Sequence, residues 1–169
     1  MIKLAGAMNL LMSGNAFIYY GEELGMKGSG RDENKRAPMQ WTKDSGMAGM
    51  CKGPKDMEEF EMMYGTLEEQ AEDKNSIYNY YKNAIKLRHS FPVIARGKTK
   101  LYDGFENLDS DTVSAFTRNM PDESYESVLV VINTSENSIS QKLGKDYTKL
   151  GSFLVTGEEE VTIKDGTLN

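Results

Sequence analysis

The segment Phe17–Met26, followed by Arg31–Trp41, constrains the fold more than any other part of this chain. Phe17–Tyr20 is a short apolar and aromatic run with the turn residues Ser13–Asn15 before it and Gly21 after it, which predicts one fully buried strand. A glycine-containing loop dense in charged residues comes next. Because α/β barrels carry their binding residues on the loops that follow strands, this order predicts a site at the carboxyl end of a strand.

Composition limits the class of protein. The chain has 169 residues, of which 38% are hydrophobic and 27% charged, as in globular proteins of one ordinary domain or two small ones. The net charge of -6 and the pI near 4.9 argue against a nucleic-acid partner, because phosphates require a basic surface. A neutral or weakly polar ligand fits this charge better.

Metal and thiol chemistry have little support. Cys51 is the single cysteine, so an internal disulfide is excluded, and Cys51 with His89 is too few ligands for a Cys/His zinc site within one chain. We therefore expect no metal and no cofactor. We interpret Cys51 as an unreactive loop thiol, and His89 as a capping or packing residue at a helix end.

The first residues predict a helix. Lys3 and the apolar run Leu4–Met12 resemble a secretory signal, but Asn9 interrupts the run, so a buried amphipathic helix is the better interpretation. No run reaches the ~20 apolar residues that a membrane span needs. We expect neither a signal peptide nor a membrane helix in this chain, and its localisation stays open.

A second helix is predicted from Ser76 to His89, with Ser76 as N-cap and Pro92 just past its end. One face of this helix carries Ile77, Tyr81, Ala84, Ile85 and Arg88. The long connection Thr42–Lys74 precedes it, and helical spacing predicts a short helix within Lys55–Tyr64.

The character of the sequence changes near residues 92–98. Apolar runs separated by turn residues then predict strands at Thr112–Arg118, Ser127–Ile132, Phe153–Val155 and Val161–Ile163. Alternation along Thr112–Arg118 predicts an antiparallel sheet with one covered face and one partly wet face. Asn133 is interpreted as a turn former rather than a glycosylation site. The predicted fold class is α+β, with domains at 1–95 and 96–169.

Two features of the loop suggest carbohydrate chemistry. Glu22 and Glu23 invite comparison with the carboxylate pair of retaining glycosidases, held ~5 Å apart. Because adjacent side chains on a strand point to opposite faces, we favour support of the loop through backbone or arginine contacts. The indole of Trp41 near Arg36 and carboxylates is a common arrangement for binding a sugar ring.

The run Leu4–Trp41, with Phe-Ile-Tyr-Tyr-Gly-Glu-Glu-Leu-Gly-Met and Lys-Arg-Ala-Pro-Met-Gln-Trp, resembles the α-amylase family, glycoside hydrolase family 13. Leu67–Gln70 and Ser76–Arg88 resemble the stretch that leads into the last barrel helix of that family. The resemblance implies the terminal part of a (β/α)8 barrel, in which Phe17–Tyr20 is the eighth strand and Ser76–His89 the eighth helix. Residues after Lys98 then form a C-terminal β-sandwich domain that lacks its last strand.

The resemblance also implies a function. The three catalytic carboxylates of the family lie on the fourth, fifth and seventh strands, which would precede Met1, so we expect no catalytic residue in this chain and no activity of the chain alone. The expected parent is a retaining α-amylase acting on α-1,4-glucans or maltooligosaccharides. Expected substrate contacts are Arg36, Trp41, Tyr20 and Glu22.

Alternatives stay open. The parent is otherwise an α-glucosidase, an oligo-1,6-glucosidase or a trehalose-forming relative, or the chain is a non-catalytic carbohydrate-binding or interaction module centred on the β domain. An exposed Phe17–Tyr20 strand would also leave edge groups unpaired, so we expect it to pair with another copy, rearrange or be poorly ordered.

Overall fold

A computed structural model describes residues 1–44, 49–59, 62–122, 124–151, 154 and 160–169. The chain divides into two compact units, residues 1–9 with 16–84 and residues 10–15 with 85–169. Two helices, α1 (Ile2–Leu11) and α4 (Ile77–Ser90), contribute residues to both units. The predicted domains at 1–95 and 96–169 remain a prediction.

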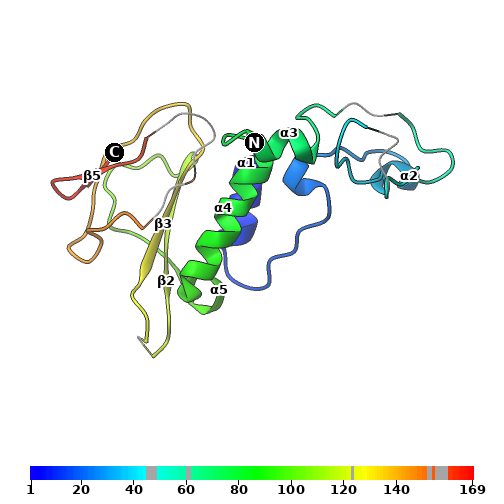
Figure 1. Cartoon of the computed structure of the whole chain (residues 1–169). Coiled ribbons are helices and arrows are strands. Elements are labelled where there is room, and N and C mark those ends of the chain that lie inside the picture. The colour runs from blue at the N-terminus through cyan, green and yellow to red at the C-terminus, as the bar shows by residue number, and fades with distance from the viewer. Residues whose placement is uncertain (45–48, 60–61, 123, 152–153, 155–159) are drawn as a thin grey trace. The chain divides into compact units, whose positions relative to one another are not determined.

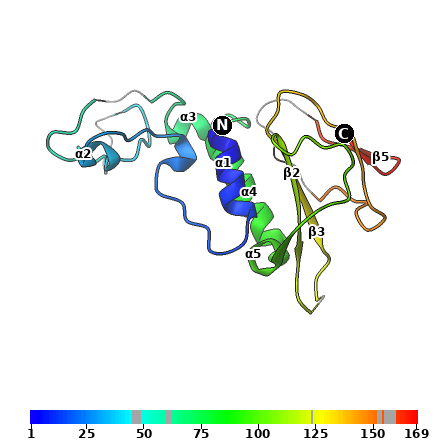
Figure 2. The same ribbon diagram turned by 180° about the vertical axis from the view of Figure 1, so that it is seen from behind.

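The first helix confirms the helix predicted over Leu4–Met12. Helix α1 buries Ala7, Leu10 and Leu11. Gly6 lies against the ring of Tyr81 on α4, and a Cβ at Gly6 would overlap that ring. The two helices lie side by side in both views (Figure 1 and Figure 2). Glycine at position 6 therefore permits this close approach.

The buried strand predicted at Phe17–Tyr20 is wrong for this chain. The segment is irregular backbone without ladder hydrogen bonds, and Phe17 is 79% exposed and Tyr19 56% exposed. A strand needs a neighbour to receive its backbone hydrogen bonds, and none of the described strands lies beside this segment. An apolar pattern without a partner strand therefore stays uncovered here.

The connection between Gly21 and α4 contains three short helical turns. They are the 3-10 helix η1 (Glu22–Leu24), α2 (Asp32–Lys35) and α3 (Leu67–Glu72). The short helix predicted within Lys55–Tyr64 is not seen in the described residues 55–59 and 62–64. A positive φ of 68° at Asp56 breaks helical geometry there, and Gly53 and Gly65, at φ 77° and 87°, flank the segment.

Helix α4 confirms the prediction from Ser76 onward. The hydroxyl of Ser76 accepts a hydrogen bond from the N–H of Asn79 at 3.1 Å, as an N-cap does. Ile77, Tyr81 and Ala84 are buried, as their spacing predicted, and Tyr80 joins them. The helix ends at Ser90, and Pro92 opens the next helix, α5 (Pro92–Arg96).

A three-stranded antiparallel sheet follows, in the order β1 (Lys98–Leu101), β2 (Val113–Asn119) and β3 (Val128–Asn133). Figure 2 shows the long pair β2 and β3, whose register places Phe116 opposite Val130. The strands at Thr112–Arg118 and Ser127–Ile132 are thereby confirmed. The face of β2 predicted to be partly wet is exposed at Ser114, whereas Phe116 and Arg118 on that face are buried, as are Val113, Ala115 and Thr117.

Helix α5 explains why Arg118 can be buried. The guanidinium of Arg118 is fully enclosed and donates to the carbonyl of Ile94 at 2.7 Å and to the hydroxyl of Thr99. Burial lowers the pKa of Arg118, and the charge of Arg88 lowers it further. A side chain that looked solvent-facing in the alternation therefore ties α5 to the sheet.

A second antiparallel sheet is formed by very short strands in the order β4 (Gln141–Lys142), β6 (Thr167–Leu168) and β5 (Ile163–Lys164). Only the last residue of the predicted strand Val161–Ile163 belongs to β5. Phe153 and Val155, which bound the other predicted strand, lie outside the described residues. Antiparallel pairing is confirmed; packing of the sheets as a sandwich is not established.

The end of β3 confirms the interpretation of Asn133 as a turn former. Its side-chain oxygen accepts hydrogen bonds from the N–H of Ser135 at 2.9 Å and from the hydroxyl of Ser135 at 2.7 Å. Its amide nitrogen donates to the carbonyl of Asn137 at 2.8 Å. The whole amide is therefore used to close the turn.

Candidate functional site

The polypeptide reverses at Gly21, directly after the aromatic segment. Gly21 has a φ of 89°, a conformation that favours glycine, and its N–H donates to a carboxylate oxygen of Glu23 at 2.9 Å. Glu23 thus supports the loop through a backbone contact, as predicted. Glu22 is exposed at the start of η1, and the charges of both carboxylates add to burial in raising the pKa of Tyr81. Glu23 therefore stabilises the turn that follows the aromatic segment.

Tyr20 connects the aromatic segment to the charged loop. Its hydroxyl donates to the carbonyl of Ala37 at 3.0 Å, and its ring lies 4.8 Å from that of Tyr19. Desolvation raises the pKa of Tyr20 and Tyr19 adds to the shift, while the cation of Arg36 opposes it. The structure therefore brings Tyr20 and Arg36 to the same part of unit 1.

Arg36 ends the short helix α2. Its Nε donates to the carbonyl of Asp32 at 3.3 Å, and its side chain is exposed. Lys35 pairs with Asp32 at 3.2 Å on the same turn, with both side chains largely exposed. The guanidinium nitrogens beyond Nε carry no protein hydrogen bond among the described interactions. Arg36 is thus held at one atom and presents a forked donor to the surface.

Asn34 ties the charged loop to Ser29 and Glu58 by hydrogen bonds. It was not among the site residues predicted from the sequence. Its amide nitrogen donates to the carbonyl of Ser29 at 3.0 Å and to the carboxylate of Glu58 at 2.9 Å. Its amide oxygen accepts from the N–H of Glu58 at 3.0 Å. Such a reciprocal contact between positions 24 residues apart has no local sequence signal.

Trp41 is placed by helix α3. The carbonyl of Gln40 accepts from the N–H of Leu67 at 2.9 Å, and that of Trp41 accepts from the N–H of Glu68 at 3.0 Å. These two N–H groups belong to the first turn of α3, where backbone donors have no partner within the helix. The residue is 43% exposed. The backbone of Trp41 is therefore fixed while its ring faces solvent.

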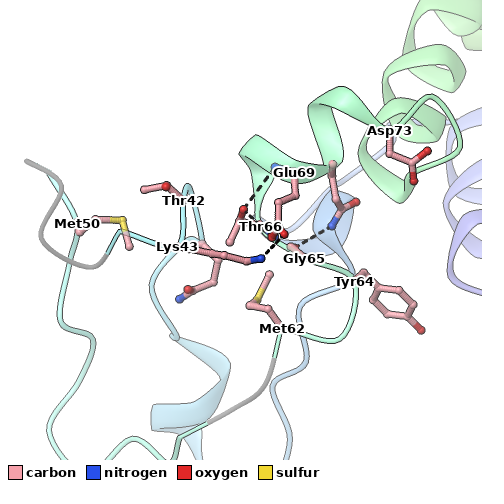
Figure 3. Close-up of a pocket in the computed structure, with 11 residues that line it drawn as sticks. Thr42, Lys43, Met50, Met62, Tyr64, Gly65, Thr66, Glu69 and Asp73 are labelled. Carbon is pink, nitrogen blue, oxygen red and sulfur yellow. Dashed lines mark hydrogen bonds and ion pairs between the residues drawn. The ribbon is translucent and has the colours of Figure 1, made fainter.

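A pocket of about 600 Å³ lies beside α3. Figure 3 shows Lys43 pointing toward Glu69, with Met62 below this pair and Met50 at the left of the view. The ammonium of Lys43 lies 2.5 Å from the carboxylate of Glu69, and this contact is the main cause of the lowered pKa of Glu69. Eleven residues line the pocket: Gln40, Thr42, Lys43, Met50, Met62, Tyr64, Gly65, Thr66, Glu69, Gln70 and Asp73.

A capping box begins α3 at this pocket. The hydroxyl of Thr66 accepts from the N–H of Glu69 at 3.5 Å, and the carboxylate of Glu69 accepts from the N–H of Thr66 at 3.0 Å. Thr42 adds a hydrogen bond to Glu68 at 2.7 Å. This motif is readable from Thr-Leu-Glu-Glu. It stabilises the turn that holds Trp41.

The four predicted contact residues do not form one tight cluster. Tyr20 and Arg36 come together, Trp41 is held separately at α3, and Glu22 lies within electrostatic reach of Tyr81.

His89 and Cys51 are exposed, and Cys51 is a free thiol. Within the described residues, no group of three or more His, Cys, Asp or Glu side chains is arranged to hold a metal ion. None of the described helices is both long and apolar enough to cross a membrane.

Comparison with known proteins decides the family. The pattern described as "Alpha amylase, catalytic domain" matches residues 1–97. The chain belongs to the α-amylase family. Alpha-amylase 3 of Dictyoglomus thermophilum is 37% identical over 97 residues, which are 56% of this chain and 19% of that protein. The oligo-1,6-glucosidase of Heyndrickxia coagulans is 32% identical over 153 residues, 88% of this chain and 25% of that protein.

A solved structure is similar to this chain over nearly its whole length. The chain described as Eubacterium rectale Amy13B is 43% identical and superposes with a TM-score of 0.87 over 99% of this chain and 32% of that chain. The resemblance to glycoside hydrolase family 13 is therefore confirmed, and it extends into the β strands. The chain spans about a fifth to a third of the length of these relatives.

Proposed function

We propose that this chain forms one wall of the glucan-binding site of an α-amylase-type glycoside hydrolase. Its parent would hydrolyse α-1,4-glucosidic bonds by the retaining double displacement, with catalytic carboxylates outside this chain. The hydrogen bond from Tyr20 to Ala37 carries the proposal, because it joins the exposed aromatic segment to the loop that presents Arg36. The chain alone would then be inactive.

The fold supports this assignment in outline. In our proposal, residues 1–95 are the end of a (β/α)8 barrel and residues 96–169 are a β-sandwich domain. The 79% exposure of Phe17 is what a barrel strand without its neighbours would show. Within a complete barrel, Phe17–Tyr20 would be the eighth strand, and Gly21 would then turn the chain at the mouth of the barrel.

Each wall residue has a defined chemical role in this proposal. The indole of Trp41 covers the apolar face of a glucose ring, and the forked donor of Arg36 bonds its hydroxyls. Tyr20 and Glu22 lie nearer the barrel mouth and contribute polar contacts. Such residues position substrate and do not transfer protons.

Substitution in the full-length parent tests the proposal. Arg36→Ala and Trp41→Ala should raise KM or lower kcat for maltooligosaccharides by about tenfold each, as expected when a contact worth ~1.4 kcal/mol is lost. Arg31→Ala is the matched control, because Arg31 is exposed on the same loop and, among the described residues, its side chain contacts only Glu33, at 3.9 Å. Unchanged kinetics in both test variants would refute the assignment.

A second specificity has support from relatives that are named oligo-1,6-glucosidases. The 32% identity with an oligo-1,6-glucosidase over 88% of this chain favours a parent that cleaves α-1,6 bonds as the alternative to an α-amylase. Assay of the parent on maltotriose and isomaltose separates the two, because each enzyme class would prefer one linkage.

The carbohydrate-binding module is less well supported. Tyr102, Phe105 and Tyr147, which looked scattered in the sequence, meet edge to face with ring centroids 5.0 and 5.7 Å apart. Burial raises the pKa of Tyr147. Rings packed edge to face stabilise a small core, whereas a sugar needs an open flat ring. Calorimetric titration of the chain with maltooligosaccharides, beside its residues 98–169, would detect module binding.

A further inference from the structure

Gln70 is a buried polar side chain on helix α3. It is 2% exposed. Its Nε2 donates to the carbonyls of Leu24 at 2.9 Å and Gly65 at 3.1 Å. Its Oε1 accepts from the N–H of Tyr78 at 3.1 Å. Both donors and the acceptor of one amide are therefore satisfied by backbone groups.

The three partners belong to three different segments. Leu24 ends η1, the turn that begins with Glu22. Gly65 directly precedes the cap of α3, and Tyr78 lies in the first turn of α4. A glutamine amide is one of the few side chains that can donate twice and accept once at such a point. One side chain thus fixes the relative positions of three segments of unit 1.

The backbone at Gln70 reinforces the same point. Its carbonyl accepts from the hydroxyl of Ser76 at 2.6 Å and from the amide of Asn79 at 3.0 Å. The same Asn79 nitrogen also donates to the carbonyl of Asp73 at 2.9 Å. The C-terminal end of α3 is thereby bound to the N-terminal end of α4, so α3 cannot shift independently of it.

Trp41 is the residue that depends on this arrangement. Its carbonyl and that of Gln40 are bound by the first turn of α3, and Gln70 lies on the same helix. A continuous path of hydrogen bonds therefore runs from Leu24 through Gln70 and α3 to Trp41. Loss of the two bonds donated by Gln70 would free η1 from α3 and leave two carbonyls unsatisfied.

We propose that Gln70 is a positioning residue that fixes the position of Trp41 relative to the turn that begins with Glu22. The sugar-binding role of Trp41 rests on the proposed function above, but the positioning of Trp41 does not. Gln70 touches no substrate in this proposal. It acts by fixing where the indole stands relative to the turn after the aromatic segment.

The only tryptophan of the chain gives a direct readout, because Trp41 alone supplies the indole fluorescence. Gln70→Glu keeps an acceptor for the N–H of Tyr78 but, when ionised, offers no proton to Leu24 or Gly65. We expect the acrylamide quenching constant of Trp41 to change at least twofold at pH 8 in this variant. Burial favours the protonated carboxyl, which regains one donor, so the change should shrink at pH 5.

Two further variants sharpen the test. Gln70→Leu has no titrating group, so its quenching should be altered equally at pH 8 and pH 5. Gln141→Glu is the matched control, because Gln141 is partly buried and its side chain, among the described residues, donates only to the carbonyl of Glu106 at 3.3 Å. Its Trp41 quenching should equal that of wild type at both pH values.

The outcomes are distinct. Unchanged Trp41 quenching in both Gln70 variants would overturn the proposal, as would a Gln70→Glu change that does not depend on pH. If Trp41 moves as expected while Trp41→Ala leaves the parent's kinetics intact, the positioning role stands and the glucan contact fails. Should Gln70→Leu not fold, the pH dependence of Gln70→Glu alone decides, with far-UV circular dichroism recorded at each pH.

Discussion

The guanidinium of Arg88 donates a hydrogen bond of 2.6 Å to the carbonyl of Gly14, across 74 positions of the chain. The same group donates to the carbonyls of Leu10 at 2.6 Å and Met12 at 3.1 Å. Helix α1 ends at Leu11, so Arg88 satisfies carbonyls that have no partner within the helix. A positive charge there also complements the negative end of the helix.

Replacement of Arg88 should therefore destabilise the fold. We expect Arg88→Gln to lower the free energy of unfolding by about 1.5–3 kcal/mol, the usual effect of losing a charged hydrogen bond. Urea unfolding followed by circular dichroism measures the change. Lys86→Gln, on an exposed position of the same helix, should change it by less than ~0.5 kcal/mol. Equal stability of the two variants would contradict the capping role of Arg88.

Gly6→Ala tests the close approach of α1 and α4. Alanine is the better helix former by ~1 kcal/mol, yet its Cβ would overlap the ring of Tyr81. We expect a net loss of about 1–3 kcal/mol in thermal or urea unfolding. Combining Gly6→Ala with Tyr81→Leu removes the ring and should cost less than the sum of the two single changes. Additive effects would show that the two sites do not touch.

The ion pair between Lys43 and Glu69 predicts that the stability of the fold decreases at acid pH. The ammonium of Lys43 holds the pKa of Glu69 below its usual range, with the N–H of Thr66 adding to the effect. A carboxylate with a lowered pKa in the folded state stabilises the fold above its unfolded pKa, and this contribution is lost as pH falls through the folded value. Glu69→Gln should thus melt below wild type at pH 7 and approach it below pH 4. Glu68→Gln, which changes the adjacent carboxylate on α3, is the variant whose melting temperature is compared with that of Glu69→Gln.

The burial of Tyr80 predicts that the stability of the fold decreases at alkaline pH. Burial raises the pKa of Tyr80 to about 12, and Tyr81 contributes. Because the unfolded phenol ionises near 10, this group stabilises the fold below pH ~10 and the contribution is lost as pH rises toward 12. Tyr80→Phe should flatten the fall of melting temperature over that range. The same change at exposed Tyr125 should leave the slope as in wild type.

Exposure of the aromatic segment Phe17–Tyr20 predicts self-association. A second copy of the chain is also the partner that the sequence analysis anticipated. Phe17 is 79% exposed next to Tyr19 at 56%. Uncovered apolar side chains and unpaired backbone favour contact with a second copy. Sedimentation velocity of the chain should show concentration-dependent dimers that Phe17→Ser weakens. Leu101→Ser, at an 82% exposed site on β1, is the control. A monomer at all concentrations would remove this prediction.

Local patterns predicted the elements that depend on local physics. The N-cap at Ser76, the buried face of α4 and the turn at Asn133 follow from hydrogen bonds within a few residues, so the sequence was sufficient. The family was also readable, because a contiguous motif from Leu4 to Trp41 carries it. The contacts predicted for Arg36, Trp41, Tyr20 and Glu22 remain predictions.

Other features required the tertiary structure. Phe17–Tyr20 has the composition of a buried strand, but a strand exists only where neighbours supply hydrogen bonds and cover its faces, and none of the described strands does so here. The alternating pattern of β2 predicts a solvent-facing side chain at Arg118, yet α5 covers it. Gln70 joins segments up to 46 residues apart. Sequence therefore determined the family and the local elements, whereas the folded structure decided which side chains hold the site together, because burial and long-range hydrogen bonds depend on what packs against each segment.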